Sequence, residues 1–309
     1  MVVPASTTPA LGSTAADTSD IQRFMSACTF EATRPSDKDT AALQDVVAKG
    51  THVYLTMLPH RPIDELVESA MAIRAIGLEP VPHLSARHFA TIAEVDKALS
   101  QLAKKATVKR VMLIGGDIAR PSGSVSDVLQ VIESGILQAN GILAAGVAGF
   151  PDGHPVVSSD ELEASLVTKL AALQAAGVDG YVVTQFCFHA RTVLSWLEWL
   201  RARGISSHVK IGLAGPTSLM TWLNYARKCG VKASAEALAS RSGLVKQAFK
   251  SVSPDPIIRS LADAIAAGRI ENVSPHLFAF GGIGATAKWA QPAIKGTIRL
   301  NGDKGFDAV

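Results

Sequence analysis

The stretch Val111-Met-Leu-Ile-Gly-Gly-Asp-Ile-Ala-Arg-Pro-Ser-Gly123 decides the fold class of this chain. Its first four residues are apolar without polar alternation, which predicts a strand buried on both faces. Gly115 and Gly116 end the strand, and Asp117 follows at its exit, ahead of a turn that contains proline and glycine. A lone carboxylate in this position is either a functional group of an α/β enzyme or the cap of a turn or helix. The stretch alone leaves both interpretations open.

Strand-like and helix-like segments alternate on both sides of this stretch. Besides residues 111–114, we expect strands over Ser26–Glu31, His52–Thr56, Pro80–Leu84, Ile142–Phe150, Gly180–Phe186, Val209–Ala214 and Pro275–Phe280. We expect helices over Asp37–Ala48, Ile63–Ile76, Ile92–Lys105, Asp160–Ala176, Thr192–Arg203 and Pro256–Ala267, and a helical hairpin at about Leu219–Cys229 and Ala235–Lys250.

Eight short strands separated by helices indicate an α/β protein of the (β/α)8 TIM barrel type, folded as a single domain. A doubly wound open sheet is the competing fold, but it usually carries a glycine-rich phosphate loop after its first strand, and none follows here. We assign residues 21–309 to the barrel as the catalytic domain and residues 1–20 to a disordered N-terminal tail. The segment after Trp289 is left without an assignment.

The composition excludes several classes of protein. With 309 residues, 48% hydrophobic residues and a net charge of +3, the chain has material for a large core and no charge excess that favours nucleic acid or a membrane as a partner. No apolar run reaches the roughly 18 residues of a membrane helix. Cys28, Cys187 and Cys229 are widely separated in apolar surroundings, which is typical of buried free thiols. We therefore expect a cytoplasmic protein.

Polar or aromatic residues stand at or near the ends of most of the expected strands. In a barrel these ends meet at one mouth, and polar side chains are costly to bury there without a partner. The histidines show no metal-ligand spacing, and no Gly-x-Ser-x-Gly elbow is present. The candidates gathered at the mouth are Glu31, Thr56, His83, Asp117, Phe150, His154, Gln185 and Phe278.

Several of these residues belong to motifs whose order along residues 24–285 resembles that of the methylenetetrahydrofolate reductases. The most specific pieces are the run Gly146-Val-Ala-Gly-Phe-Pro-Asp-Gly-His-Pro155 and Thr184-Gln-Phe186. The weaker pieces are Phe30-Glu31, Pro82-His-Leu84, Gly116-Asp117, Cys229-Gly-Val231 and His276-Leu-Phe278.

The resemblance implies a barrel that reduces 5,10-methylenetetrahydrofolate to 5-methyltetrahydrofolate with a hydride from NADH or NADPH. By this likeness Glu31 is the general acid that protonates the folate nitrogen, which requires a pKa raised by burial. Asp117 stabilises positive charge that develops on the pterin. Gln185 donates or accepts a hydrogen bond at the pterin edge. The family's aromatic residue after the seventh strand is replaced near Leu219 and Met220, and its tyrosine in the eighth strand is Phe278. We assign Met220 and Phe278 to substrate binding.

The resemblance also implies a flavin site, which this sequence keeps only in part. Positions that line the flavin in FAD-containing members correspond to Thr56, His83, Gly116, Asp117, Phe150 and His154. The basic cluster that meets the FAD pyrophosphate is reduced to Lys169, and the arginine before the Gly-Asp pair is Gly115. Several charge-assisted contacts, each worth about 1.5–3 kcal/mol, are thereby lost. We predict that FAD binds weakly or not at all and that hydride passes directly from nicotinamide to folate.

Two other functions remain open at this point. One is a barrel methyltransferase that uses methyltetrahydrofolate, and the other is a non-catalytic folate-binding protein. A buried general acid at Glu31 favours catalysis over mere binding. The sequence leaves the choice of NADH or NADPH, the physiological direction and the oligomeric state open.

Overall fold

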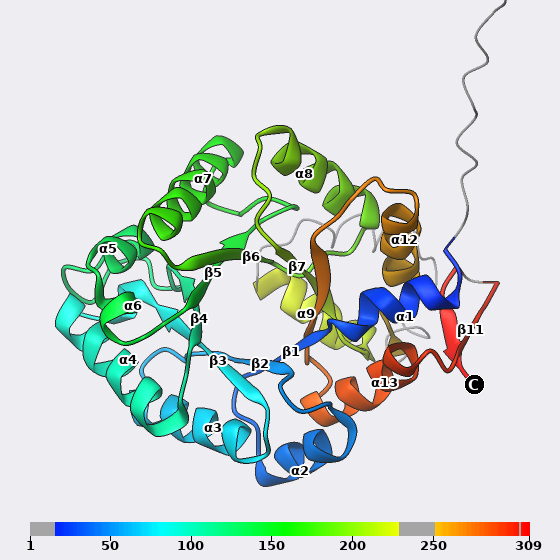
Figure 1. The fold of residues 1–309 in the computed structure, drawn as a ribbon, viewed down its shortest axis with the longest axis horizontal. Coiled ribbons are helices and arrows are strands. Elements are labelled where there is room, and N and C mark those ends of the chain that lie inside the picture. Colours follow the sequence, from blue (N-terminus) through cyan, green and yellow to red (C-terminus); the bar gives the residue numbers. More distant parts are fainter. Residues whose placement is uncertain (1–15, 229–250, 303) are drawn as a thin grey trace, which may run out of the picture.

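A closed barrel of eight parallel strands forms the centre of the molecule (Figure 1). The computed structural model describes residues 16–228, 251–302 and 304–309. The strands follow one another around the barrel in the order β1-β10-β7-β6-β5-β4-β3-β2. Their bounds are β1 Thr29–Ala32, β2 His52–Leu55, β3 Glu79–Ser85, β4 Arg110–Ile114, β5 Ala144–Gly149, β6 Asp179–Thr184, β7 Val209–Ala214 and β10 Val273–Phe278. The predicted (β/α)8 barrel is confirmed.

The helices form a ring outside the strands (Figure 1). The main ones are α2 Asp37–Val46, α3 Ile63–Ala75, α4 Ile92–Ala106, α7 Ser159–Ala175, α8 Ala190–Ala202, α12 Asp255–Ala266 and α13 Ile283–Lys295. Two short helices that we did not predict, α5 Val128–Glu133 and α6 Ile136–Ala139, lie between β4 and β5.

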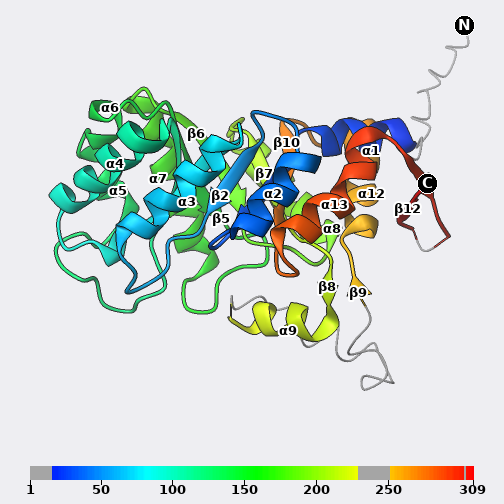
Figure 2. The ribbon, with the colours of Figure 1, turned by 90° about the horizontal axis from the view of Figure 1, so that it is seen from below.

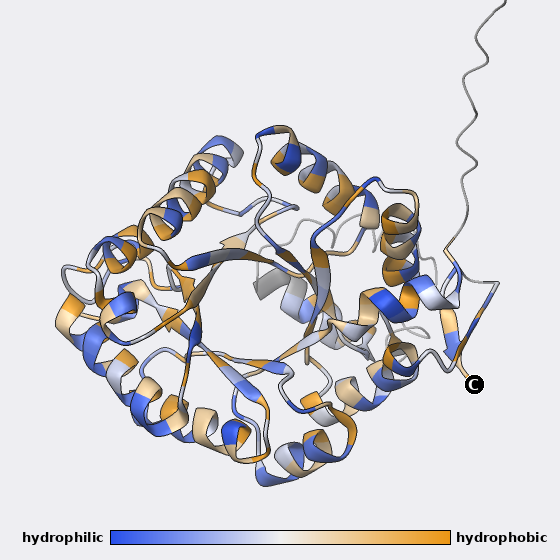
Figure 3. Ribbon diagram, viewed as in Figure 1, coloured by the Kyte–Doolittle hydropathy of each residue, from blue (hydrophilic) through white to orange (hydrophobic). Residues whose placement is uncertain are grey.

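Each outer helix turns an apolar stripe to the barrel, and α4 shows how the sequence builds one. Its N-cap Thr91 accepts a hydrogen bond from the backbone N–H of Glu94, which satisfies one of the free donors of the first turn. Val95, Leu99 and Leu102 recur at helical spacing and are fully buried. Figure 3 shows apolar and polar residues alternating along the ring of helices, as amphipathic helices require.

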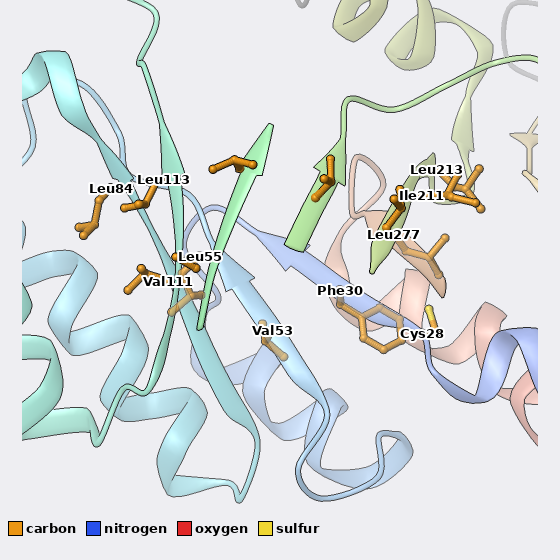
Figure 4. Packing of buried hydrophobic residues seen from close by; sticks show 14 of the residues in the cluster. Cys28, Phe30, Val53, Leu55, Leu84, Val111, Leu113, Ile211, Leu213 and Leu277 are labelled. Carbon is orange, nitrogen blue, oxygen red and sulfur yellow. The ribbon is translucent and has the colours of Figure 1, made fainter. Parts of the chain in front are cut away.

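The core has two layers because successive strand residues point to opposite faces. Outward residues such as Val53, Val111 and Leu213 pack against the helices (Figure 4). Inward residues, including Tyr54, Met112 and Tyr181, fill the barrel itself. A Cβ at Gly146 of β5 would lie 2.7 Å from the Tyr181 ring and 2.8 Å from the Met112 sulfur. Glycine at this position therefore leaves the space that two large side chains occupy.

The N-terminal boundary differs from the prediction. Helix α1, Thr18–Ser26, begins inside the segment that we assigned to a tail, because the Asp17 side chain accepts from the backbone N–H groups of Ser19 and Asp20 and forms a capping box. Its buried residues Ile21 and Met25 belong to the main core. The helix occupies Ser26, so the first strand starts at Thr29 and is shorter than expected.

The unassigned segment after Trp289 completes the barrel. Helix α13 runs through it, packs against α1 and α2, and ends at Gly296 in the left-handed conformation. We did not predict this helix because Pro292 lies inside it and glycines lie at its start, and both residue types disfavour helices in a sequence pattern. A two-stranded sheet of β11 Ile298–Leu300 and β12 Phe306–Ala308 follows.

An additional segment stands at the mouth of the barrel, beyond the carboxyl end of β7. Short strand β8, Thr217–Ser218, pairs antiparallel with β9, Ser251–Val252, and helix α9, Leu219–Lys228, follows β8 (Figure 2). The first helix of the predicted hairpin is thus present, whereas its second helix, the motif 229–231 and Cys229 lie outside the described residues. No helix in the described part of the chain is long and apolar enough to cross a membrane.

Candidate active site

The carboxyl group of Glu31 lies inside the barrel, near the mouth. Its side chain is 14% exposed, and the register places it between Tyr54 of β2 and Phe278 of β10. The hydroxyl of Thr56, just after β2, donates to Oε1 of Glu31 at 3.3 Å. Three residues from the predicted set, Glu31, Thr56 and His83, are thus brought into one group.

His276 of β10 was part of a family motif but was not predicted as a site residue. Its Nε2 atom lies 3.2 Å from Oε2 of Glu31, and its Nδ1 atom lies 2.9 Å from the Thr29 hydroxyl. The imidazole is fully buried. Ser274, His276 and Phe278 alternate along β10 toward the barrel interior, so strand periodicity combined with the β1–β10 register is the signal that identifies His276.

His83 of β3 approaches the same carboxylate oxygen from another side. Its Nε2 atom is buried and lies 3.4 Å from Oε2 of Glu31, and among the described residues no group forms a hydrogen bond of good geometry with it. The Tyr54 ring lies edge-on to both imidazoles, with centroid distances of 4.6 Å to His276 and 6.1 Å to His83. Glu31 therefore has two imidazoles on one oxygen and a hydroxyl on the other.

This arrangement determines the charge of the free site. Burial alone would raise the pKa of Glu31, but the positive charge that His83 carries when protonated and the hydrogen bond from His276 outweigh burial and hold the pKa well below its ordinary range. Burial lowers the pKa of His276, which favours the neutral imidazole, although Glu31 opposes this shift. The expected elevation of the Glu31 pKa is therefore wrong for the free site, where the carboxyl group is ionised.

Aromatic rings line the mouth beside this group. Phe278 lies 5.0 Å from the His276 ring and 5.7 Å from Phe186, between centroids, and belongs to one cluster with Phe188 and Phe280. Helix α9 adds two rings that we did not predict for the site. Trp222 lies 3.9 Å from Phe188, and Tyr225 stacks on Phe280 at 4.0 Å.

Gln185 follows β6 at the edge of this cluster and is partly buried. Its Oε1 atom accepts a hydrogen bond from the backbone N–H of Phe186 at 3.0 Å, which fixes the amide group. Met220, in the first turn of α9, is 48% exposed. Of the three residues assigned to substrate binding, Phe278 and Gln185 lie at the ring cluster, whereas Met220 faces solvent to a large extent.

Asp117 does not join the Glu31 group. Its side chain is 73% exposed, and its Oδ1 atom lies 3.0 Å from Nε2 of His88, which follows β3. Gly116 has φ of +94°, and a Cβ there would lie 3.1 Å from the His88 ring. Glycine therefore allows the strand exit to pass closely under His88, and Asp117 is held by a histidine that the sequence analysis missed.

Phe150 and His154 form a separate pair after β5, with their ring centroids 5.3 Å apart. Phe150 also lines a solvent-open hollow of about 420 Å³, beside Leu166 and Trp196. Thr56 lines another such hollow of about 300 Å³ at the exit of β2. The six residues expected to line a flavin are thus distributed over the Glu31 group, the His88–Asp117 pair and the Phe150–His154 pair.

The fit of an FAD pyrophosphate depends on the cations near these loops. Arg87, which follows β3, donates to the carbonyl oxygens of Gly115 and Gly116, and its guanidinium lies 3.6 Å from where a Cβ of Gly115 would be. Lys169 of α7 is partly buried, and burial lowers its pKa. Arg87 is thus already bonded to the backbone, and Arg120 in the loop after β4 is exposed. In the described part of the chain, Lys169 and Arg120 are the cations of these loops and of α7 that remain for a pyrophosphate, and they come from separate elements rather than from one basic cluster.

No group of three or more histidine, cysteine or acidic residues in the described ranges could hold a metal ion. Although Glu31, His83 and His276 are side chains that bind metals, here both imidazoles face the carboxylate itself. Such a cluster can exchange protons. A buried carboxylate that is flanked by imidazoles and adjoins an aromatic mouth is an arrangement typical of the acid–base sites of barrel enzymes.

Comparison with known proteins gives the family. Residues 64–273 match the family model described as Methylenetetrahydrofolate reductase, and the chain belongs to this family. It is 24% identical over 174 residues to Methylenetetrahydrofolate reductase 2 of Saccharomyces cerevisiae, a match that covers 53% of this chain and 27% of the yeast protein. The chain thus spans about a quarter of the length of that relative.

Among solved structures, the chain is similar to the dihydropteroate synthase (FolP) of Thermus thermophilus. The TM-score is 0.46 and the identity 15%, over 84% of this chain and 89% of that one. It is also similar to the wild-type sialic acid aldolase of Ruminococcus gnavus. In that case the TM-score is 0.46 and the identity 10%, over 87% and 71% of the two chains.

Proposed function

We propose that this protein reduces 5,10-methylenetetrahydrofolate to 5-methyltetrahydrofolate, or catalyses the reverse, with NADH or NADPH as the hydride carrier. The observation that carries the proposal is the Glu31 carboxyl group, buried at the mouth and bonded by His276 and Thr56, in a chain of this family. Cys28 and Cys187 are buried free thiols, which supports our expectation of the cytoplasm.

Glu31 is the general acid in this proposal. A proton delivered to the folate nitrogen breaks one carbon–nitrogen bond of the methylene bridge and leaves an iminium cation on the other nitrogen. A hydride from the nicotinamide then adds to the methylene carbon and forms the methyl group, so one proton and one hydride are consumed per turnover. Proton transfer of this kind contributes about 10²–10⁴-fold to a rate. Asp117, near the mouth but solvent-exposed, would stabilise positive charge on the bound pterin.

The aromatic cluster provides a surface for flat rings. Phe278 and Phe280 are partly exposed and lie beside His276 and beyond it, and the buried rings of Phe186 and Phe188 support them from below. Gln185 is fixed at this wall through its Oε1 atom, and its amide nitrogen makes no hydrogen bond within the described residues. A pterin stacked on these rings would find a donor in Gln185.

Direct hydride transfer, without tightly bound FAD, is part of the proposal. Its support is the state of the described cations near these loops. Arg87 is bonded to the Gly115 and Gly116 carbonyls, Lys169 is partly buried, and Arg120 after β4 is exposed. With few charges to hold a flavin pyrophosphate, the mouth is left to the nicotinamide and the folate together.

An absorbance spectrum of the purified protein, followed by NADH and NADPH oxidation with methylenetetrahydrofolate, tests the proposal. We expect a colourless protein that oxidises one nicotinamide only when the folate is present, at a rate that added FAD does not change. Stoichiometric flavin retained through purification would overturn direct transfer but leave folate reduction intact. A protein that stays inactive with and without FAD would favour methyl transfer or folate binding without catalysis.

A further inference from the structure

Two imidazoles converge on one oxygen atom of Glu31. His276 lies 3.2 Å and His83 3.4 Å from Oε2, while Thr56 donates to Oε1. His276 and Thr56 already give each carboxylate oxygen one hydrogen-bond partner, and each oxygen has a second lone pair that can accept another. The second imidazole therefore approaches an oxygen that already has one partner.

The two imidazoles differ in how they are held. His276 is fully buried, and the Thr29 hydroxyl lies 2.9 Å from its Nδ1 atom. When Thr29 donates to Nδ1, the hydrogen of the neutral ring is on Nε2 and points at Glu31. The Thr29 hydroxyl, both ring nitrogens and Oε2 of Glu31 then each have a hydrogen-bond partner. His276 is thus a fixed neutral donor that aims the carboxylate.

The Nε2 atom of His83, which lies near Glu31, is held differently. That nitrogen is buried, has no hydrogen-bond partner in the part of the chain that the structure describes, and lies 3.4 Å from Oε2 of Glu31. When protonated it can donate to the carboxylate, and when neutral it can accept from the protonated acid. Imidazole is the side chain that makes this exchange near neutral pH.

We propose that His83 is a positioning residue that returns the catalytic proton to Glu31 in each turnover. The inference rests on the proposed function. In the direction of folate reduction, the N–H bond at Nε2 of protonated His83 breaks and an O–H bond forms at Oε2 of Glu31, which leaves a neutral imidazole and a neutral acid. Glu31 then gives this proton to the folate nitrogen and becomes a carboxylate again. His83 regains a proton from solvent, since its side chain is 9% exposed.

The other groups around His83 do not compete for this proton. Tyr54 faces it from β2, and burial raises the pKa of this phenol well above its ordinary value. From β4, Met112 lies beside it in the register and does not titrate. His276 faces the same carboxylate from β10, and burial lowers its pKa. The exchange is therefore confined to His83 and Glu31.

The test compares His83→Gln with the wild-type enzyme and with His208→Gln. Glutamine keeps a donor near the Nε2 position but cannot carry the proton. His208 is a partly buried histidine that is bonded to Asn272 and Ser274, and it serves as the matched control. The measurements are kcat and KM of folate-dependent NAD(P)H oxidation between about pH 5 and 9, and folate binding by calorimetry.

We expect His83→Gln to lower kcat by about 10²-fold or more, to leave folate binding and KM within about threefold, and to change the pH dependence of kcat. Added imidazole should restore part of the activity of His83→Ala, and His208→Gln should behave as the wild type. A His83→Gln enzyme with wild-type kcat and pH profile would overturn the role of His83, as would a folate-binding His83→Ala enzyme that imidazole does not rescue. A wild-type enzyme without folate-dependent oxidation would instead overturn the proposed function.

Discussion

The Oε2 atom of Glu31 lies 3.2 Å from Nε2 of His276, although 245 residues separate them along the chain. The contact spans the seam where β1 and β10 pair, with Thr29 opposite His276 and Glu31 opposite Phe278. The position of the carboxyl group therefore depends on closure of the barrel. A change that weakens the β1–β10 pairing should displace the Glu31 carboxyl group from His276.

The first prediction concerns Glu31 itself. Glutamine keeps the size of the side chain but has no proton to donate, so we expect Glu31→Gln to lower kcat by at least about 10²-fold while folate binding is largely retained. NAD(P)H oxidation and calorimetric folate binding measure the two effects. Glu79→Gln changes another strand acid, one that pairs with Arg74, and is the control. Normal turnover by Glu31→Gln would show that the acid is another group.

The lowered pKa of Glu31 predicts a dependence of stability on pH. Because the folded state holds the carboxyl group ionised below the ordinary glutamate pKa of about 4.3, the unfolded state binds more protons there, and this stabilisation is lost as pH falls. The free energy of unfolding of the wild type should therefore fall more steeply between about pH 5 and 3 than that of Glu31→Gln. Urea unfolding at several pH values measures the two slopes, and equal slopes would contradict the pKa direction.

Lys210 of β7 points into the amino-terminal end of the barrel and is 8% exposed. Burial, assisted by the charge of Arg110, lowers its pKa from 10.5 to about 8. The folded state therefore bears a cost at neutral pH, up to about 3 kcal/mol, which disappears as pH rises from about 8 to 10.5. We expect Lys210→Met to raise the free energy of unfolding at pH 7, with the gain shrinking over this interval.

Urea unfolding at about pH 7, 8.5 and 10 follows this gain, and Lys295→Met, which changes an exposed lysine of α13, is the control. A Lys210→Met variant that is no more stable than the wild type at pH 7 would show that the charged lysine is well solvated in the folded protein.

Gly146 offers a test of packing inside the barrel. An alanine there would place its methyl group 2.7 Å from Tyr181 and 2.8 Å from Met112, and overpacking of this kind costs about 1–3 kcal/mol. Gly302→Ala should be nearly neutral, because no atom of the described residues other than its chain neighbours lies within 4 Å of the added Cβ. In a double-mutant cycle, Met112→Ala should recover part of the loss from Gly146→Ala, and strict additivity would argue against the clash.

The sequence predicts the barrel well because its strands are apolar runs of the right length between glycine and helix signals. All eight strands are present, with ends that shift by up to three residues. Helix α13 is missed because Pro292 and the glycines before it contradict the helix pattern, whereas packing against α1 and α2 stabilises it. Helix α1 is missed because its capping box lies inside a polar, alanine- and serine-rich segment.

The site is predicted in part, for a similar reason. Glu31, His83 and Phe278 stand on strands, and the geometry of a parallel barrel brings strand ends together. His276 was not predicted as a site residue because its contact with Glu31 follows from the register between β1 and β10, which the sequence does not give. The contact between His88 and Asp117 joins two loops 29 residues apart, and no local pattern records such a pairing. Loop contacts of this kind become visible only in three dimensions.

The pairing of β8 with β9 has a consequence for how this chain can vary. Thr217 faces Val252 and Ser218 faces Ser251, so the chain leaves the barrel rim and returns to it at adjacent points. Because β8 and β9 pair with each other, a change in the number of residues between them should have little effect on β7 and β10. Lengthening such a loop adds little to the entropy cost of closing it. A change in α9 therefore reaches the aromatic side of the mouth, where Trp222 and Tyr225 pack, while Glu31 and His276 are held by strands that α9 does not belong to.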